Sequence, residues 1–226
     1  MHRKPKNCFF TTLDTNSTGS REQAGETPVI KMPASIDSRP PGIGDPARRH
    51  IVNKVGGEDV NWLKYGYETN GEYSEIECTC EPGGGPPLHY HATYTETFTS
   101  LEGELILQIG DEEPKVVEVG SSHTVEKGVV HRFSAGPKGA KMNVRLEPAS
   151  AGFEKSLYVF FGLANDGLLG KDLMPLNMLH TLLLGYWGDM GFPGVVGGIM
   201  NTVQTVGATY ARWTGVEAEL LEKYWK

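Results

Sequence analysis

Cysteine is scarce in this chain, which has only Cys8, Cys78 and Cys80 among its 226 residues. An odd number of cysteines without a regular spacing gives no support for a secreted domain built on disulfides. The N-terminal segment contains charged side chains but lacks the apolar core of a secretory signal peptide. The sequence therefore predicts a cytoplasmic protein.

Long apolar runs are also missing. The chain has no uninterrupted apolar stretch of about 18 residues, the length that a transmembrane helix requires. The nearest candidate begins at Phe192 and is interrupted by Asn201, Thr202, Gln204 and Thr205. We therefore expect no stable membrane insertion.

Positive charge is in deficit, because 21 Lys and Arg residues stand against 28 Asp and Glu residues, for a net charge of -7. No basic patch is available to contact a phosphate backbone. Nothing like a helix-turn-helix is present at the start of the chain. The composition thus excludes nucleic acid as the expected partner and leaves a small-molecule substrate as the hypothesis.

Glycine, by contrast, is abundant with 29 residues, and proline adds 14, which favours many turns and short strands. Residues 1–48 are polar and rich in Ser, Thr, Pro and Gly, as expected for a flexible N-terminal arm. Residues 49–148 contain short β-like runs separated by turn residues, which predicts an all-β domain of roughly eight strands. Residues 149–226 carry apolar side chains at helical spacing, which predicts a helical C-terminal extension.

The clearest strand pattern is SEIECTCE. Ile76, Cys78 and Cys80 share one face of this run, and acidic and polar residues share the other. In the run KMNVRLEP, Met142 and Val144 alternate with polar residues in the same way. Such alternation predicts strands with one face in a core.

Side chains that ligate metals gather just after the run GGGPP. His89 and His91 are two residues apart, so in a strand their imidazoles point to the same side. Glu96 is an odd number of residues further on, and a turn or bulge near Ala92 and Thr93 is needed to bring its carboxylate to that side. His131, at the start of a later β-like run, is the natural fourth ligand. The alternative is that these are simply polar residues inside a β-barrel.

The two segments resemble the two motifs of the cupin superfamily. The first motif, G-x5-H-x-H-x4-E-x6-G, is matched at every fixed position, namely Gly83, His89, His91, Glu96 and Gly103. The second, G-x5-P-x-G-x2-H-x3-N, is matched at Gly120, Gly128 and His131. The sequence departs from it at two positions, with Glu126 in place of proline and Ala135 in place of asparagine.

The resemblance implies an all-β core folded as a double-stranded β-helix, a small jelly-roll barrel, with the helical extension after it. It also implies one divalent transition metal held by His89, His91, Glu96 and His131. Histidine and carboxylate together suit Fe, the first choice, or Mn, Ni, Cu or Zn. Small barrels of this kind often pair through exposed edges, so we expect a homodimer, held in part by the arm or the C-terminal helices.

The function that the resemblance implies is a metal-dependent oxidoreductase of the dioxygenase type. Its substrate would be a small aromatic or enol-like, polyketide-like compound of small-molecule or secondary metabolism. Glu96 would be both ligand and catalytic base. Two alternatives stay open: a non-redox isomerase, cyclase or lyase, and a cupin that binds a small ligand without turnover.

Five further residues are candidates for the substrate pocket, although each has a structural alternative. Cys78 and Cys80 could line the metal cavity or be small core residues. Phe98 and Phe133 could contact substrate or pack in the core. Arg145 could bind a substrate carboxylate or form a structural ion pair. We interpret His123 as a surface or outer-shell group and His180 as structural.

Overall fold

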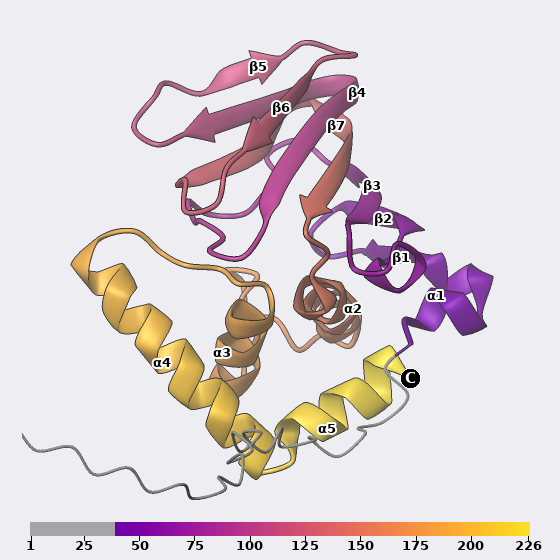
Figure 1. The fold of residues 1–226 in the computed structure, drawn as a ribbon, viewed down its shortest axis with the longest axis vertical. Helices are drawn as coiled ribbons and strands as arrows, with labels where there is room; N and C mark the ends of the chain where they lie inside the picture. The colour runs from indigo at the N-terminus through magenta and orange to yellow at the C-terminus, as the bar shows by residue number, and fades with distance from the viewer. Residues whose placement is uncertain (1–38) are drawn as a thin grey trace, which may run out of the picture. The chain divides into compact units, whose positions relative to one another are not determined.

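The computed structural model describes residues 39–226, which fall within one compact unit spanning Asp37–Lys226. Most of the expected N-terminal arm therefore lies outside the described residues. Within residues 39–226 the core is an antiparallel β structure followed by helices, as Figure 1 shows. This arrangement confirms the expected all-β core with a helical C-terminal extension.

The described residues form seven strands: β1 (His50–Asn53), β2 (Glu58–Lys64), β3 (Ser74–Cys80), β4 (Thr95–Ile109), β5 (Lys115–Val117), β6 (Ser122–Val125) and β7 (His131–Glu147). Every pairing is antiparallel, in the order β1-β2-β3-β7-β4-β5, and β6 also pairs with β4. Because β7 lies between β3 and β4, chain segments far apart in sequence meet at the centre of the sheet.

The alternating pattern of β3 is confirmed. Ile76, Cys78 and Cys80 are buried, and Cys78 stands opposite Val60 of β2 and Met142 of β7. These side chains belong to one hydrophobic core, which the helices extend. The β-like patterns of the sequence thus identify the inner face of the sheet.

Strands β4 and β7 are long and bend together. Their pairing runs from Thr95 opposite Glu147 to Ile109 opposite His131, with register shifts on either side of Gly103. Gly103 has φ 76°, and a side chain there would collide with the backbone of Gly139. The bend allows both halves of β4 to pair with β7.

The helical extension comprises α2 (Ala151–Asn165), α3 (Met178–Trp187), α4 (Gly194–Trp213), α5 (Val216–Leu220) and a final turn, η3 (Leu221–Trp225). Ser150 caps α2 by accepting a hydrogen bond from the backbone N–H of Phe153. Tyr158 of α2 contacts the barrel residue Tyr65 through their hydroxyl groups, 2.6 Å apart. Figure 1 shows α2 at the end of the strands, α3 beside it and α4 outside α3.

Two short helical turns precede the first strand, within the segment predicted as the arm. They are α1 (Pro41–Gly44) and η1 (Pro46–Arg49). Arg49 forms an ion pair with Glu68 at 2.8 Å, and Arg48 donates a 2.7 Å hydrogen bond to the backbone oxygen of Tyr224. Residues 41–49 therefore connect the β domain to the last helical turn. Among residues 39–226, no helix has both the length and the apolar character needed to cross a membrane.

A buried carboxyl group joins α2 to the β domain. Oε1 of Glu154 accepts hydrogen bonds from the backbone N–H of Gly66 at 2.7 Å and from the hydroxyl of Ser74 at 2.6 Å. Burial raises the pKa of Glu154 above its usual value, although both hydrogen bonds oppose that shift. Between the pKa of the unfolded chain and this raised pKa, the folded state binds more protons, so its stability falls as pH rises.

We expect Glu154→Gln to keep both hydrogen bonds, because the amide retains one acceptor oxygen, and to remove the cost of a buried charge. The variant should be at least as stable as the wild type at neutral pH, and the difference should shrink as pH falls through the raised pKa. Glu154→Ala should instead lose about 1–3 kcal/mol, since a buried donor is left without a partner. Urea unfolding across a pH series measures both effects. Equal losses in the two variants would contradict this role.

Candidate metal centre

Four side chains from separated segments converge inside the β domain. His89, His91, Glu96 and His131 each offer one ligand atom, and these atoms all lie within 4.8 Å of one another. The Nε2 atoms of His89 and His91 are 3.0 Å apart, and Oε2 of Glu96 is 2.9 Å from Nε2 of His131. All four residues are at most 6% exposed. The structure thus brings together the complete set that the sequence predicts.

Backbone pairing explains how the histidines meet. His89 and His131 exchange two hydrogen bonds, 3.0 and 2.7 Å long, in an antiparallel bridge, so their side chains share one face. The approach to this bridge passes Gly85, with φ 138°, where a side chain would collide with the backbone of Phe133. Glycine is therefore required for the chain to come this close to β7.

Glu96 reaches the same side because the chain bends first. Residues 92 and 93 form the bend between the bridge and the start of β4. Within β4, Glu96 stands opposite Leu146 of β7 and shares its inner face with Phe98. The expected break near Ala92 and Thr93 is present.

Backbone carbonyls fix the proton positions on all three imidazoles. Nδ1 of His89 lies 2.8 Å from the oxygen of Pro87, and Nδ1 of His131 lies 2.9 Å from that of Val129. Nδ1 of His91 lies 3.1 Å from the oxygen of Asp189. Because a carbonyl only accepts hydrogen bonds, each Nδ1 carries a proton. In a neutral ring the Nε2 atom then presents a lone pair.

The centre of the cluster is consequently rich in electron pairs. Three Nε2 atoms and a carboxylate oxygen lie so close together that a proton or a cation is needed between neighbouring atoms. Outer hydrogen bonds from Nδ1 to carbonyls are the usual support of histidines that ligate a metal. The donor set of three imidazoles and one carboxylate fits a single divalent transition metal.

Burial and mutual charge set the ionisation of the cluster. Burial, with the neighbouring His91 and His131, lowers the pKa of His89 to about 4. Burial alone would raise the pKa of Glu96, but His91 and His131 hold it well below its usual range. Burial alone would lower the pKa of His91, but the Glu96 carboxylate outweighs it and raises that pKa. At neutral pH the cluster therefore offers an ionised carboxylate and a neutral His89.

The predicted pocket residues divide into near and distant ones. The Phe98 ring is 6.1 Å from the ring of His131, so Phe98 borders the cluster, and the Phe133 ring packs 5.6 Å from that of Phe98. Cys78 and Cys80 are buried with their sulfur atoms 3.5 Å apart. Among the described residues, neither cysteine joins the group of ligand atoms.

Arg145 is not brought to the cluster. Its neighbours Val144 and Leu146 in β7 face the core, so alternation turns Arg145 outward. There its guanidinium lies 3.7 Å from the ring centre of Tyr73 and pairs with Glu147. Of the two alternatives for Arg145, contact with a substrate carboxylate and a structural ion pair, the structure contains the ion pair.

A turn between α3 and α4 completes the surroundings of the cluster, a contact that no sequence pattern predicted. The carboxylate of Asp189 accepts two 2.7 Å hydrogen bonds from Thr93, one from its N–H and one from its hydroxyl. Tyr94 donates its hydroxyl proton to the oxygen of Gly188 at 2.7 Å, and Tyr90 pairs with the backbone of Gly191. The run GDMGFPG predicts a break between two helices, but it does not predict that this break contacts the segment that follows His89.

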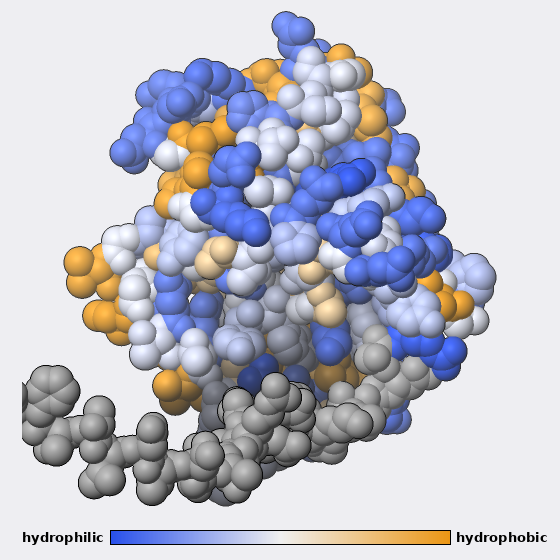
Figure 2. All heavy atoms as spheres, in the orientation of Figure 1, coloured by the Kyte–Doolittle hydropathy of each residue, from blue (hydrophilic) through white to orange (hydrophobic). Residues whose placement is uncertain are grey.

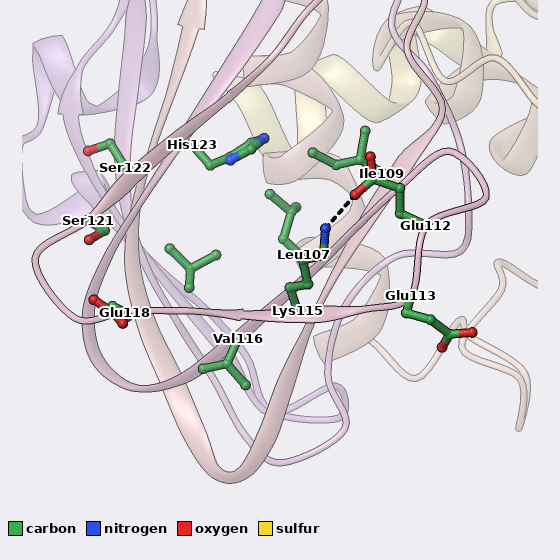
Figure 3. A pocket seen from close by; sticks show the side chains of 11 residues that line it. Leu107, Ile109, Glu112, Glu113, Lys115, Val116, Glu118, Ser121, Ser122 and His123 are labelled. Carbon is green, nitrogen blue, oxygen red and sulfur yellow. Dashed lines mark hydrogen bonds and ion pairs between the residues drawn. The ribbon is translucent and has the colours of Figure 1, made fainter.

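A hollow of about 270 Å³ opens between β4, β5 and β6 (Figure 3). Leu107 and Ile109 of β4 and His123 of β6 are among the side chains that line it, and an ion pair between Lys115 and Glu112 lies on its rim. Ile109 pairs with His131, and His123 pairs with Phe98. The hollow therefore lies on strand positions adjacent to the cluster. His123 is exposed, as expected for an outer group.

Removing one ligand should abolish tight metal binding. We expect His131→Ala to weaken metal binding by more than the roughly 10–100-fold that loss of an outer hydrogen-bond partner costs. Competition with a chromogenic chelator measures the affinity. His123→Ala is the matched control, because this exposed histidine is outside the cluster and should leave affinity unchanged. Similar metal affinities for His131→Ala and His123→Ala would contradict the assignment of His131 as a metal ligand.

The turn at Asp189 should support metal affinity through His91. Asp189 has φ 51°, so Asp189→Gly removes the carboxylate without backbone strain, and Asp189→Asn keeps an acceptor oxygen. We expect the glycine variant to bind metal roughly 10-fold more weakly and the asparagine variant to bind nearly as the wild type does. Asp172→Ala is the control, because the Asp172 carboxylate accepts a hydrogen bond from the backbone N–H of Met174 and is not part of the group of ligand atoms. Unchanged affinity in Asp189→Gly would show that the turn is not a support.

The family comparison places this cluster in a known domain. Residues 76–144 match the model described as "Cupin domain". A curated relative, Epoxidase atD of Aspergillus terreus, is 29% identical over 116 residues, which cover 49% of this chain and 36% of that protein. The chain thus spans about a third of the length of that relative.

Solved structures with cupin folds are also similar to part of the chain. An RmlC-like cupin from Shewanella frigidimarina has a TM-score of 0.39 at 23% identity, covering 46% of this chain and 86% of that one. A variant of oxalate decarboxylase from Bacillus subtilis has a TM-score of 0.39 at 20% identity, and the match covers 45% of this chain and 27% of that one. The matched segment 76–144 contains all four residues of the cluster. The family model, rather than these partial structural likenesses, assigns residues 76–144 to a cupin domain.

Proposed function

We propose that this protein is a metal-dependent cupin oxidoreductase of the dioxygenase type, acting on a small aromatic or enol-like compound of small-molecule or secondary metabolism. The observation that carries the proposal is the convergence of three Nε2 atoms and the Glu96 carboxylate in a buried site. Three neutral imidazoles and one carboxylate leave a divalent ion with net positive charge. A bound redox-active ion supplies Lewis acidity and electron transfer to dioxygen.

Glu96 is the candidate proton acceptor. Its carboxylate stays ionised because His91 and His131 hold its pKa well below the usual range. The same low pKa makes it a weak base while it contacts both imidazoles. Accepting a proton from a substrate hydroxyl therefore requires the carboxylate to move away from at least one of them as the substrate binds.

Aromatic and aliphatic side chains favour a small, mostly apolar substrate. Phe98 lies against the cluster with Phe133 packed on it, and Leu107 and Ile109 line the neighbouring hollow. The hollow, about 270 Å³, is near the small end of the roughly 300–1,000 Å³ typical of ligand pockets. Its polar rim, which includes His123, offers hydrogen bonds that would orient a hydroxyl or carbonyl group.

The curated relative supports oxygen chemistry without identifying the reaction. It is named an epoxidase, a word that denotes oxygen transfer to a carbon–carbon double bond. Its matched part includes less than half of its own length, so its substrate is not transferred to this chain.

Oxygen uptake by the reconstituted protein tests the proposal. The protein is loaded separately with Fe(II), Mn(II), Ni(II), Cu(II) and Zn(II), mixed anaerobically with phenolic or β-dicarbonyl compounds, and then exposed to oxygen. We expect substrate-dependent uptake with at least one redox-active ion and none with Zn(II). Turnover with Zn(II) in the absence of oxygen would instead establish the non-redox isomerase, cyclase or lyase.

The role of Glu96 is tested in the same assay. We expect Glu96→Gln to lower kcat by about 100-fold or more, the range for loss of a general base, after metal content has been matched to the wild type. Glu102→Gln, an exposed position of the same strand, is the control and should keep its rate. A Glu96→Gln variant with normal kcat at full metal loading would exclude the carboxylate as the base.

A further inference from the structure

Helix α4 exposes an apolar stripe along its whole length. The stripe consists of six side chains, of which Val196 is 78% and Trp213 is 81% exposed: Val196, Ile199, Val203, Val206, Tyr210 and Trp213. Hydrophobic side chains protrude on the flank of the molecule where α4 begins (Figure 2). Isolated exposed apolar residues are normal, but a continuous row along a 20-residue helix is not.

The spacing of the stripe is that of a helix–helix seam. Its successive members are separated by 3, 4, 3, 4 and 3 residues, which is the a/d pattern of a coiled coil. The opposite face of α4 is already used, because Gly207, Ala208 and Ala211 are buried where α4 packs on α3. The stripe therefore faces away from the core, as a second seam.

The chemistry of α4 favours a protein partner over a lipid surface. Its only charged residue is Arg212, which pairs with Glu217 at 2.7 Å and lies over the ring of Tyr186. Helices that lie on membranes are usually rich in Lys and Arg on their polar face. The stripe with the flanking Val195 and Met200 exposes on the order of 900 Å², close to the roughly 800 Å² that each partner contributes to a stable interface.

The stripe is also complementary to itself. Reversing the helix places Val196 opposite Trp213, Ile199 opposite Tyr210 and Val203 opposite Val206, so every member finds another member. The start of α4 is built from small residues and its end from aromatic ones. An antiparallel pair would thus set large side chains against small ones, as a well-packed interface requires.

A shallow hollow at the aromatic end supports this match. About 390 Å³ of space is lined by Thr205, Val206, Thr209, Tyr210 and Trp213. In the antiparallel arrangement, Val196 and Ile199 of another copy would lie over this hollow. We propose that the α4 stripe is the interface of a homodimer, in which α4 of one copy packs antiparallel on α4 of a second copy about a two-fold axis between Val203 and Val206.

The interface would also restrain the turn beside the metal site. Asn201 of α4 donates a hydrogen bond to the hydroxyl of Tyr90 at 2.8 Å and accepts one from the N–H of Phe192 at 3.2 Å. These bonds connect the start of α4 to the turn that holds His91. Pairing of α4 would restrain that turn without contributing a residue to the cluster.

Light scattering of the full-length protein tests the proposal. We expect a dimer at micromolar concentration, and Val203→Lys should weaken it by about 100-fold or more, since a charge would be buried at the centre of the interface. Val119→Lys is the matched control, because Val119 is similarly exposed outside α4 and should leave the dimer intact. Circular dichroism and thermal melting check that each variant is folded.

A mixing experiment tests the antiparallel alignment itself. Val203→Lys and Val206→Glu should each be monomeric alone and form a heterodimer when mixed, because the two new charges then face each other. A monomeric wild type, or a dimer that persists in Val203→Lys, would overturn the proposal. A monomeric wild type whose binding to phosphatidylcholine–phosphatidylserine vesicles is lost in Val203→Lys would assign the stripe to lipid and equally overturn it.

Discussion

The site depends on three imidazoles held in a fixed orientation at one buried point. Each Nδ1 of His89, His91 and His131 is tied to a backbone carbonyl, so that each Nε2 points into the cluster, where its electron pair is taken up by a proton or an ion beside the Glu96 carboxylate. Without an ion or protons between them, these electron pairs would repel one another in a site from which water is excluded. The β domain holds the cluster through rigid pairing of β4, β7 and the His89–His131 bridge.

The C-terminal helices help to hold the same cluster in place. The carbonyl that orients His91 comes from Asp189, in the turn between α3 and α4, well outside the matched segment 76–144. Thr93 and Tyr94, directly after His91, are hydrogen-bonded to that same turn. The metal-binding motif and the helical extension therefore constrain each other. In the proposed homodimer, the exposed stripe of α4 would extend this dependence to a second copy of the chain.

The sequence predicted the ligands because strand geometry and motif spacing are local properties. His89 and His91 share a face by alternation, and the need for a bend before Glu96 follows from counting residues. For Arg145 the sequence left a pocket role and a structural ion pair open, and the structure contains the ion pair, because alternation with Val144 and Leu146 turns this side chain outward. The Nδ1 partners could not be predicted, since backbone carbonyls carry no side-chain signal and Asp189 lies 98 residues from His91. Long-range register, rather than local propensity, decides those contacts.

The central claim is that one divalent ion binds inside the β domain to these four side chains. Anomalous X-ray diffraction from crystals of the metal-loaded protein tests it most directly, because it identifies the element and locates it. The predicted result is a single full-occupancy ion per chain, coordinated by Nε2 of the three histidines and by the Glu96 carboxylate. An ion bound instead at the buried Cys78–Cys80 pair, or only at the surface, would contradict it.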